Sequence, residues 1–307
     1  MNRPLTPLDL EAPIPATMPV PFVREAGGDV ASEPTSEVSL VLGMPQLSLA
    51  GLSEGWLLKE LGHRHWMLLA AMAGQAVPDF RDSDGAPVYA AFCALSVRGG
   101  AFDRLGENDR IVLSSRLRRI SRTQCASHHR VLRDGVCLGE VELVSVFVRR
   151  ASGGGNHTVA RVALDGFAAP AVMPPARPSA LAARAAELRA GRLAHHFGFD
   201  LTAPAGEGCF EIDPCPALDF NGAGFLYFSS FVGFLDRAEW HLDGRRAPHA
   251  TTRRREVFFH GNLDPGERLV VRWLAARRGE GTLVHRCRLE RLSDGVRLAD
   301  AFTERAL

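Results

Sequence analysis

The sequence repeats one pattern twice. A loop with Gly43-Met44-Pro45-Gln46-Leu47 precedes an apolar segment that ends near Trp66, and a loop with Asp219-Phe220-Asn221-Gly222 precedes another that ends near Trp240. Strand-like segments follow each apolar segment. A chain of 307 residues has room for two such units. The repeat therefore predicts a duplicated unit in which one helix is wrapped by a sheet.

The first copy predicts one helix and a set of antiparallel strands. Apolar residues recur near helical spacing from Leu52 to Leu69, and Ser53 is placed to cap the helix start. Asp134-Gly135 is a hairpin signal between the last two strands. The strands are expected at Val38 to Leu42, Pro87 to Val97, Asp109 to Arg118, Thr123 to Arg133 and Val136 to Arg149.

The second copy predicts the same order. Its helix is expected at Gly224 to Leu242, and Asp294-Gly295 takes the place of the first Asp-Gly turn. The strands are expected at Cys209 to Ile212, Thr251 to His260, Glu267 to Ala276, Thr282 to Arg291 and Gly295 to Thr303. One helix followed by a meander, twice, predicts an α+β chain and disfavours alternating βα units.

The chain divides into four parts by composition. Residues 1–36 are rich in Pro, Glu, Ala and Thr without apolar periodicity, which predicts a disordered tail. The first unit is expected at 37–167 and the second at 204–307. The linker, 168–203, combines a Pro-rich crossover from Pro170 to Pro178 with a short helix from Ala180 to Gly191.

Composition narrows the functional class. A formal net charge of +1 gives the molecule no overall electric field that would attract nucleic acid or an acidic membrane. The most apolar run, Gly224 to Leu235, is too short to cross a bilayer, and the N-terminus carries no secretion signature. The six cysteines form no CxxC pair, which predicts reduced core thiols in a cytoplasmic protein.

Two motif blocks resemble a known family. One is Gly43-Met44-Pro45-Gln46-Leu47 with Gly51-Leu52-Ser53-Glu54 and Trp56 to Glu60; the other is Asp219 to Gly224 with Leu226-Tyr227-Phe228. The order of elements resembles the hot-dog fold, and two units in one chain resemble a double hot-dog. Within that superfamily the blocks are similar to the leinamycin-type bifunctional acyltransferase/decarboxylase of polyketide biosynthesis, over Val38 to Leu307.

The resemblance implies a fold, an activity and partners. The two sheets would meet edge to edge, with the central helices side by side and an acyl-thioester tunnel between the copies. The activity would be decarboxylation of a malonyl- or methylmalonyl-type thioester and transfer of the acyl unit to an acyl carrier protein. Coenzyme A or phosphopantetheine would carry the substrate, with no further cofactor, and a homodimer is left open.

Loss of carbon dioxide leaves an enolate, so the site needs hydrogen-bond donors at the thioester oxygen. Gly222, Ala223 and Gly224 are expected at the entrance of the second helix, where free N–H groups point outwards. Asn221 adds an amide donor where many hot-dog thioesterases have a carboxylate, and Asp219 is expected to orient Asn221 or its loop. The alternative is an ordinary turn and helix cap.

The resemblance also implies a tyrosine nucleophile, and the chain has two tyrosines. Tyr89, at the start of the strand after the first helix, is favoured by its alignment with the family; its alternative is a structural strand aromatic. Tyr227 is expected in the core of the second helix with a hydrogen-bonded hydroxyl. A phenol with a pKa of about 10 needs a cation or donors to act as a nucleophile.

Other motifs have simpler interpretations. Gly51-Leu52-Ser53-Glu54-Gly55 fits the Gly-x-Ser-x-Gly pattern, but the required βαβ order is missing, which favours a helix cap at Ser53. The histidine pairs His128-His129 and His195-His196 lack a second ligand pair, so no metal is predicted. His63 is expected to line the cleft or to lie on the surface.

Three consecutive arginines, Arg253-Arg254-Arg255, must alternate faces of a strand. One or two of them, with Arg254 as the candidate, would meet the phosphates of coenzyme A or an acidic carrier protein. The alternative is a solvated edge strand.

Two other functional classes stay open. A dehydratase or thioesterase would place a carboxylate or histidine, Glu54 or His63, at the centre of the tunnel. A non-catalytic partner of the carrier protein would keep a basic surface but have an occluded tunnel.

Overall fold

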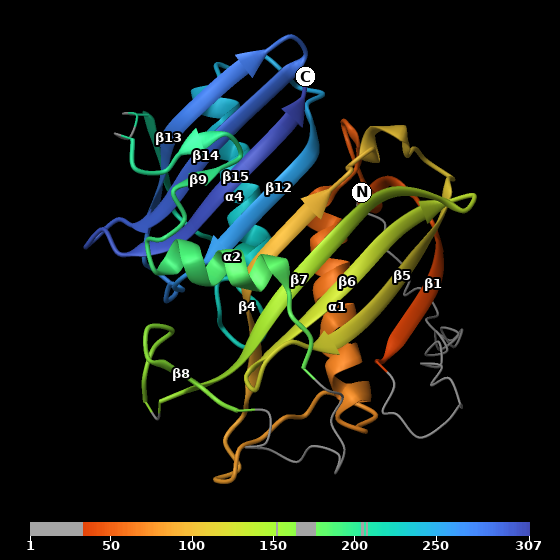
Figure 1. Ribbon diagram of the computed structural model, residues 1–307, viewed down its shortest axis with the longest axis vertical. Coiled ribbons are helices and arrows are strands. Elements are labelled where there is room, and N and C mark those ends of the chain that lie inside the picture. Colours follow the sequence, from red (N-terminus) through yellow and green to blue (C-terminus); the bar gives the residue numbers. More distant parts are fainter. Residues whose placement is uncertain (1–32, 152, 164–175, 204–205, 207) are drawn as a thin grey trace, which may run out of the picture.

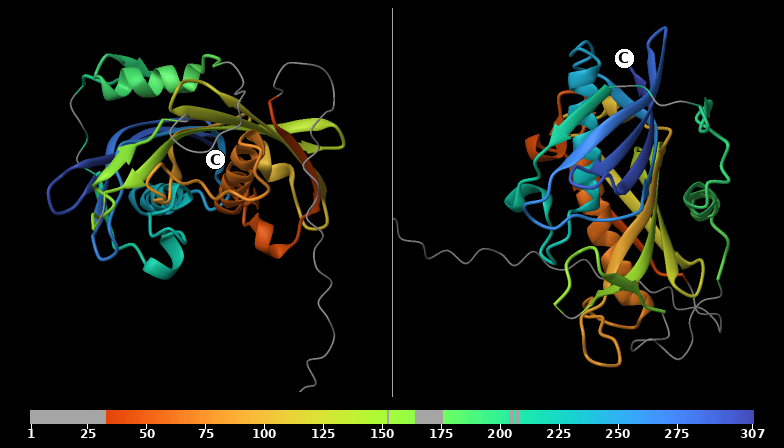
Figure 2. Two further views of the ribbon diagram at one scale, coloured as in Figure 1. Left: turned by 90° about the horizontal axis from the view of Figure 1, so that it is seen from below. Right: turned by 90° about the vertical axis from the view of Figure 1, so that its left-hand side faces the viewer.

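The computed structural model describes residues 33–151, 153–163, 176–203, 206 and 208–307. Helices α1 (Glu54–Met72) and α4 (Phe228–Leu242) lie side by side against one face of a long antiparallel sheet (Figure 1). Helix α2 (Ala180–Arg189) covers the opposite face, which gives three layers (Figure 2). Most of the expected tail and of the expected Pro-rich crossover lies outside the described residues.

The described sheet has eleven strands with the same order on either side of its centre. Outwards from the centre, one half runs β4, β7, β6, β5, β1 and the other β12, β15, β14, β13, β11, with β8 added beside β7. The first half comprises β1 (Thr35–Val41), β4 (Tyr89–Arg98), β5 (Arg110–Arg119), β6 (Gln124–Arg133), β7 (Val136–Arg150) and β8 (Val159–Arg161). The second comprises β11 (Gly208–Ile212), β12 (Thr251–Phe259), β13 (Leu269–Gly279), β14 (Thr282–Arg291) and β15 (Arg297–Ala306). This order confirms the tandem hot-dog fold.

Short elements fill the connections. They are η1 (Met44–Gln46), β2 (Leu47–Ser48), β3 (Gly51–Leu52), η2 (Phe102–Arg104), β9 (His195–His196), β10 (Phe199–Asp200) and α3 (Pro216–Asp219). None of the described helices is long and apolar enough to span a lipid bilayer.

The two halves meet strand to strand. β4 pairs with β12 in an antiparallel ladder that places Leu95 opposite Val257 and Arg98 opposite Arg254. One apolar cluster continues across this seam from Leu58 of α1 to Phe231 of α4, and both side chains are at most 1 % exposed. Burial of this surface is the main favourable contribution to the association of the halves.

An ion network crosses the same seam. Arg255 is fully buried; its Nη1 donates to Glu54 Oε1 at 3.0 Å and its Nη2 to Asp236 Oδ1 at 2.6 Å. The expected solvated edge strand is therefore wrong, because β12 lies between β4 and β15. Arg255 instead ties the start of α1 to the middle of α4.

Several local predictions are confirmed. Ser53 Oγ accepts a hydrogen bond from Trp56 N at 3.3 Å, so Ser53 caps α1. Asp134 and Gly135 have φ values of +52° and +78°, as the tight turn between β6 and β7 requires. The cysteines differ from expectation: all six are free, but only Cys93, Cys125 and Cys287 are buried, and Cys137, Cys209 and Cys215 are exposed.

Candidate active site

A cavity of about 880 Å³ lies between the two halves. Its walls come from the middle of α1, the start of β4, the loop before α4, and the chain after β12. Of the residues expected at the site, Tyr89, Asn221, Gly222, Ala223 and His63 line this cavity. Asp219, Gly224 and Arg254 do not belong to its lining.

The loop before α4 is shaped by the side chain of Asn221. Asn221 Oδ1 accepts hydrogen bonds from Ala223 N at 3.1 Å and from Phe225 N at 3.0 Å. The backbone N–H of Gly224 donates to the carbonyl of Asn221 at 2.8 Å. In the described part of the chain, this leaves Asn221 Nδ2 and the Gly222 N–H as donors without a protein partner.

The expected position of the glycines is wrong. α4 begins at Phe228, with Tyr227 as its N-cap, so Gly222 and Gly224 precede the helix rather than open it. The physical reason is the turn closed by Asn221, which ends in a bridge between Phe220 and Leu226. The residues that carry these donors line the cavity as part of a loop and not of a helix N-terminus.

Asp219 holds this loop through hydrogen bonds of its side chain and its backbone. It is 7 % exposed, and its Oδ2 accepts from Cys215 N at 2.8 Å. Its carbonyl accepts from Tyr227 N at 2.8 Å and from Ser230 Oγ at 3.1 Å. Asp219 thus fixes both ends of the loop, and its carboxylate makes no hydrogen bond to Asn221.

Both tyrosines line the cavity. Tyr89 is half-buried, and its ring meets the ring of Phe225 edge-on at 5.5 Å. Tyr227 differs from expectation: it caps α4, and its hydroxyl has no hydrogen-bond partner among the described residues. Burial raises the pKa of Tyr227 to about 12, so this hydroxyl is a neutral donor.

The polar lining of the cavity is cationic or neutral. Arg161, Arg189 and Arg291 belong to it, and so do His63, His65, His157 and His260. Among the described residues, no aspartate or glutamate lines the cavity. Such a lining favours a ligand that carries negative charge.

No local pattern in the sequence indicates these three arginines or His260. They come from β8, α2, β14 and the residue after β12, and only the fold brings them together. Arg254, which was expected to bind phosphates, has its guanidinium 4.0 Å above the ring of Phe197 and 3.7 Å from Glu256. Because Glu256 also pairs with Arg184 of α2, Arg254 lies on the face of the sheet that α2 covers, and not in the cavity.

His260 is paired with a buried carboxylate. Its Nε2 lies 2.8 Å from Asp300 Oδ2, and Asp300 is fully buried. Arg288 reaches Asp300 Oδ1 at 3.2 Å, and Arg297 reaches Oδ2. Burial lowers the pKa of His260, and the nearby carboxylate of Asp300 opposes this effect.

His65 has a different environment from His63. Both ring nitrogens of His65 are hydrogen-bonded, Nδ1 to Ser127 Oγ at 2.6 Å and Nε2 to Ser145 Oγ at 2.8 Å. Burial lowers its pKa to about 3, so the ring is neutral. His63 is exposed and lies on the opposite side of the helix, so the two histidines are not placed to bind one metal ion together.

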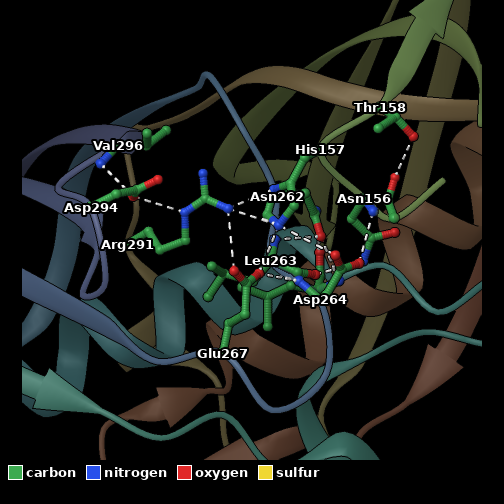
Figure 3. A network of polar contacts seen from close by, with 12 residues as sticks. Asn156, His157, Thr158, Asn262, Leu263, Asp264, Glu267, Arg291, Asp294 and Val296 are labelled. Atoms are coloured by element: carbon green, nitrogen blue, oxygen red, sulfur yellow. Dashed lines mark hydrogen bonds and ion pairs between the residues drawn. The ribbon is translucent and has the colours of Figure 1, made fainter.

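A polar network joins several residues at one rim of the cavity, and Figure 3 shows the contacts of this network. Asn156 is 3 % exposed, and its Nδ2 donates to the carbonyls of Gly224 at 2.8 Å and Leu263 at 2.5 Å. Arg150 donates to Asn156 Oδ1 at 2.7 Å and to the carbonyl of Ala223 at 2.6 Å. The connection between β7 and β8 thereby holds the Asn221 loop.

The same rim contains a His157, Asp264 and Glu267 group whose ligand atoms lie within 4.8 Å of one another. His157 Nε2 lies 2.9 Å from Glu267 Oε2, and Arg291 Nη1 lies 2.7 Å from His157 Nε2 (Figure 3). Arg291 also reaches Glu267 Oε1 at 3.2 Å. A guanidinium inside the group disfavours a metal ion there, and we interpret the group as an ion-pair network.

The comparisons with known proteins agree with the fold. No family model matches the sequence, and no curated protein matches it. The 12:0-acyl carrier protein (12:0-ACP) thioesterase from Umbellularia californica superimposes with a TM-score of 0.63 at 10% identity, over 88% of this chain and 93% of that one. An acyl-ACP thioesterase from Bacteroides thetaiotaomicron gives a TM-score of 0.57 at 10% identity, over 88% and 97%. At this identity the likeness defines the class of the fold, a double hot-dog.

Proposed function

We propose that this protein acts on acyl thioesters carried by coenzyme A or by an acyl carrier protein. More specifically, it decarboxylates a malonyl- or methylmalonyl-type thioester and transfers the acyl unit to a carrier protein, in polyketide or related secondary metabolism. The observation that carries the proposal is a cavity lined by arginines and histidines, with no described carboxylate. The two structural neighbours are named as acyl-ACP thioesterases, which supports the substrate class and, for the reaction itself, favours hydrolysis, the second candidate below.

The cavity suits a substrate with a free carboxylate. Arg161 and Arg189 provide positive charge for binding it, whereas Arg291 is paired with Glu267 and Asp294. As the carbon–carboxylate bond breaks, its electron pair forms an enolate and negative charge collects on the thioester oxygen. Asn221 Nδ2 and the Gly222 N–H are the donors for this oxygen, and donors already in place stabilise the developing charge strongly.

The loop allows the substrate to approach its backbone. A Cβ built on Gly222 would meet no atom within 4 Å, so the space beside this residue is open. Ala223 lines the wall next to it, and Gly224 shapes the turn at φ +74°. Asp219 keeps this loop in place through its carbonyl and carboxylate.

Tyr89 is the proposed acceptor of the acyl group before its transfer. It lines the cavity together with Asn221, from the opposite half of the molecule. A covalent intermediate of this kind would be an ester of the phenol.

The test uses the purified protein with malonyl- and methylmalonyl-coenzyme A. We expect release of carbon dioxide and, by intact-mass spectrometry, an acyl adduct on the protein that moves to a phosphopantetheinylated carrier protein. Tyr89→Phe should abolish the adduct and keep the release of carbon dioxide. Neither carbon dioxide nor an adduct, with either thioester and with several carriers, would overturn the proposal.

Hydrolysis of the thioester is the second candidate. Imidazoles line the cavity at His63 and His260, and a histidine can activate water. The first candidate explains the missing carboxylate better, and Glu54, the other expected base, is engaged by Arg255 and Thr252 outside the cavity. The same incubations separate the two, since a hydrolase releases the free acid. The open cavity also favours either enzyme over a carrier-binding protein with an occluded tunnel.

A further inference from the structure

His260 combines three properties of a base. It lines the cavity, its Nε2 is held by Asp300 Oδ2 at 2.8 Å, and its Nδ1 has no protein partner in the described ranges. Because an ionised carboxylate only accepts hydrogen bonds, Asp300 fixes the tautomer with hydrogen on Nε2. Nδ1 therefore carries the lone pair that can accept a proton from a ligand.

Asp300 is built to remain charged. It is fully buried, and Arg288 at 3.2 Å and Arg297 both pair with it. These cations and His260 hold the pKa of Asp300 below its ordinary value against the effect of burial. The pairing of an imidazole with a buried carboxylate is the arrangement that orients a catalytic histidine.

Hydrogen bonds connect the segment that contains His260 to the loop of the proposed oxyanion site. Asn262, two residues further on, accepts from Leu226 N at 2.9 Å and donates to the carbonyl of Leu226 at 3.0 Å. Leu226 closes the loop that contains Asn221 and Gly222. The carbonyl of Leu298 accepts from the backbone N–H of His260 at 2.8 Å, which fixes the other side.

We propose that His260, oriented by Asp300, is the general base of acyl transfer, resting on the function proposed above. Its Nδ1 takes the proton of the incoming thiol, and the thiolate attacks the acyl carbonyl. The bond from the acyl carbon to the departing group then breaks. The proton passes from the imidazolium to that group, the donor thiolate or the phenolate of Tyr89, so no net proton is gained or lost.

Decarboxylation has no such requirement. The enolate forms by loss of carbon dioxide and takes up one proton at carbon from water to give the acyl thioester, and the base is needed only when a thiol arrives. The two half-reactions therefore respond differently to a change at His260, whereas a structural role would affect both.

The charges around His260 set the expected pH dependence. Asp300 faces it from β15 and Arg297 from the start of the same strand, while Arg189 approaches from α2. Only the neutral ring can accept a proton, so transfer should fall on acidification through the pKa of His260. Loss of the Asp300 charge should move this acidic limb to lower pH, because the carboxylate favours the protonated ring.

The experiment measures carbon dioxide release and transfer to pantetheine, with malonyl- and methylmalonyl-coenzyme A as donors. We expect His260→Gln to lose about 10²- to 10⁴-fold in transfer, with release of carbon dioxide changed less than about twofold. Imidazole added to His260→Gly should restore part of the transfer rate. Asp300→Asn should shift the acidic limb of the wild-type profile downwards.

His249→Gln is the matched control, because His249 is exposed and outside the cavity lining. Transfer unchanged in His260→Gln, or equal loss of both half-reactions, would overturn the role of His260 while leaving the proposed function in place. A wild-type protein that releases no carbon dioxide and transfers no acyl group would overturn both. If Asp300→Asn does not fold, the His260 variants still decide the outcome.

Discussion

At the scale of single residues, Asn221 uses the two ends of its amide differently. Its oxygen closes the loop through Ala223 N and Phe225 N, and its nitrogen remains for the substrate. In Asn221→Asp, the carboxylate still accepts both loop hydrogen bonds but provides no donor and adds a negative charge. We expect decarboxylation to fall about 10²- to 10³-fold, the usual effect of a lost oxyanion donor.

Stability separates this effect from a folding defect. The thermal midpoint of Asn221→Asp should stay close to that of the wild type, whereas Asn221→Ala, which also loses the loop acceptor, should be less stable by about 1 kcal/mol. Both are measured by calorimetry alongside the release of carbon dioxide. Wild-type rates in Asn221→Asp would exclude the amide nitrogen as a donor.

Two buried imidazoles predict a pH dependence of stability. The pKa of His65 is lowered to about 3 and that of His129 lies well below 6.5, in both because burial disfavours the charged ring. Between these values and 6.5 the unfolded chain binds more protons than the folded one, so stability is lost as the pH falls. The free energy of unfolding should decrease below pH 6.5 by about 1.4 kcal/mol per pH unit for each ring.

Denaturant unfolding between pH 6.5 and 5 measures this slope. His128, His260 and His285, whose pKa values are also lowered, add to the slope in the same direction. Glu239 and Asp300 contribute only below about their ordinary values near 4 to 4.5. His129→Gln should flatten the slope by one ring's share, and the exposed His249→Gln should leave it unchanged. A flat profile in the wild type would show that neither ring is held neutral.

At the scale of elements, α1 crosses α4 at a glycine. A Cβ on Gly62 would lie 2.6 Å from Tyr227 Oη and 2.8 Å from Phe228 Cε1, closer than real contacts allow. We expect Gly62→Ala to destabilise the protein by about 1–3 kcal/mol through overpacking and to narrow the cavity that Gly62 lines.

The same helix offers the control. A Cβ on Gly55 would meet only Ser53 Oγ at 3.8 Å, so Gly55→Ala should stabilise α1 by roughly 0.5 kcal/mol. Thermal unfolding of the two variants compares identical substitutions in one helix. Equal midpoints would mean that the crossing tolerates a methyl group.

The elements also show how far the sequence predicts this molecule. The repeat, the strands and the Ser53 cap follow from periodicity and capping chemistry, which are local. The start of α4 was missed because a side-chain turn at Asn221 competes with the helix. Arg255 and the pair of His260 with Asp300 depend on strand neighbours that are distant along the chain, 40 residues for the pair, and local patterns contain no such register.

At the scale of the whole molecule, the site belongs to neither half alone. Tyr89 comes from the first half and Asn221 from the second, and both line one cavity. The β4–β12 ladder and the apolar cluster beneath it join these halves without a break. Either half alone would expose a strand edge, which favours association with another chain.

Continuity of this kind predicts that both halves unfold together. Trp66 packs edge-on against Phe80 at 5.0 Å in the first half, and Trp273 stacks on His285 at 4.4 Å in the second. Each tryptophan therefore reports on one half.

Replacing the other tryptophans by Phe gives one variant with Trp66 alone and one with Trp273 alone. In each, the fluorescence midpoint in urea should coincide with the midpoint from far-ultraviolet circular dichroism, as cooperative unfolding requires. Because both midpoints are measured on the same variant, a loss of stability caused by the tryptophan substitutions shifts both equally and does not affect the comparison. A fluorescence transition that precedes the dichroism in one variant and follows it in the other would mean that the halves fold separately and the seam is weak.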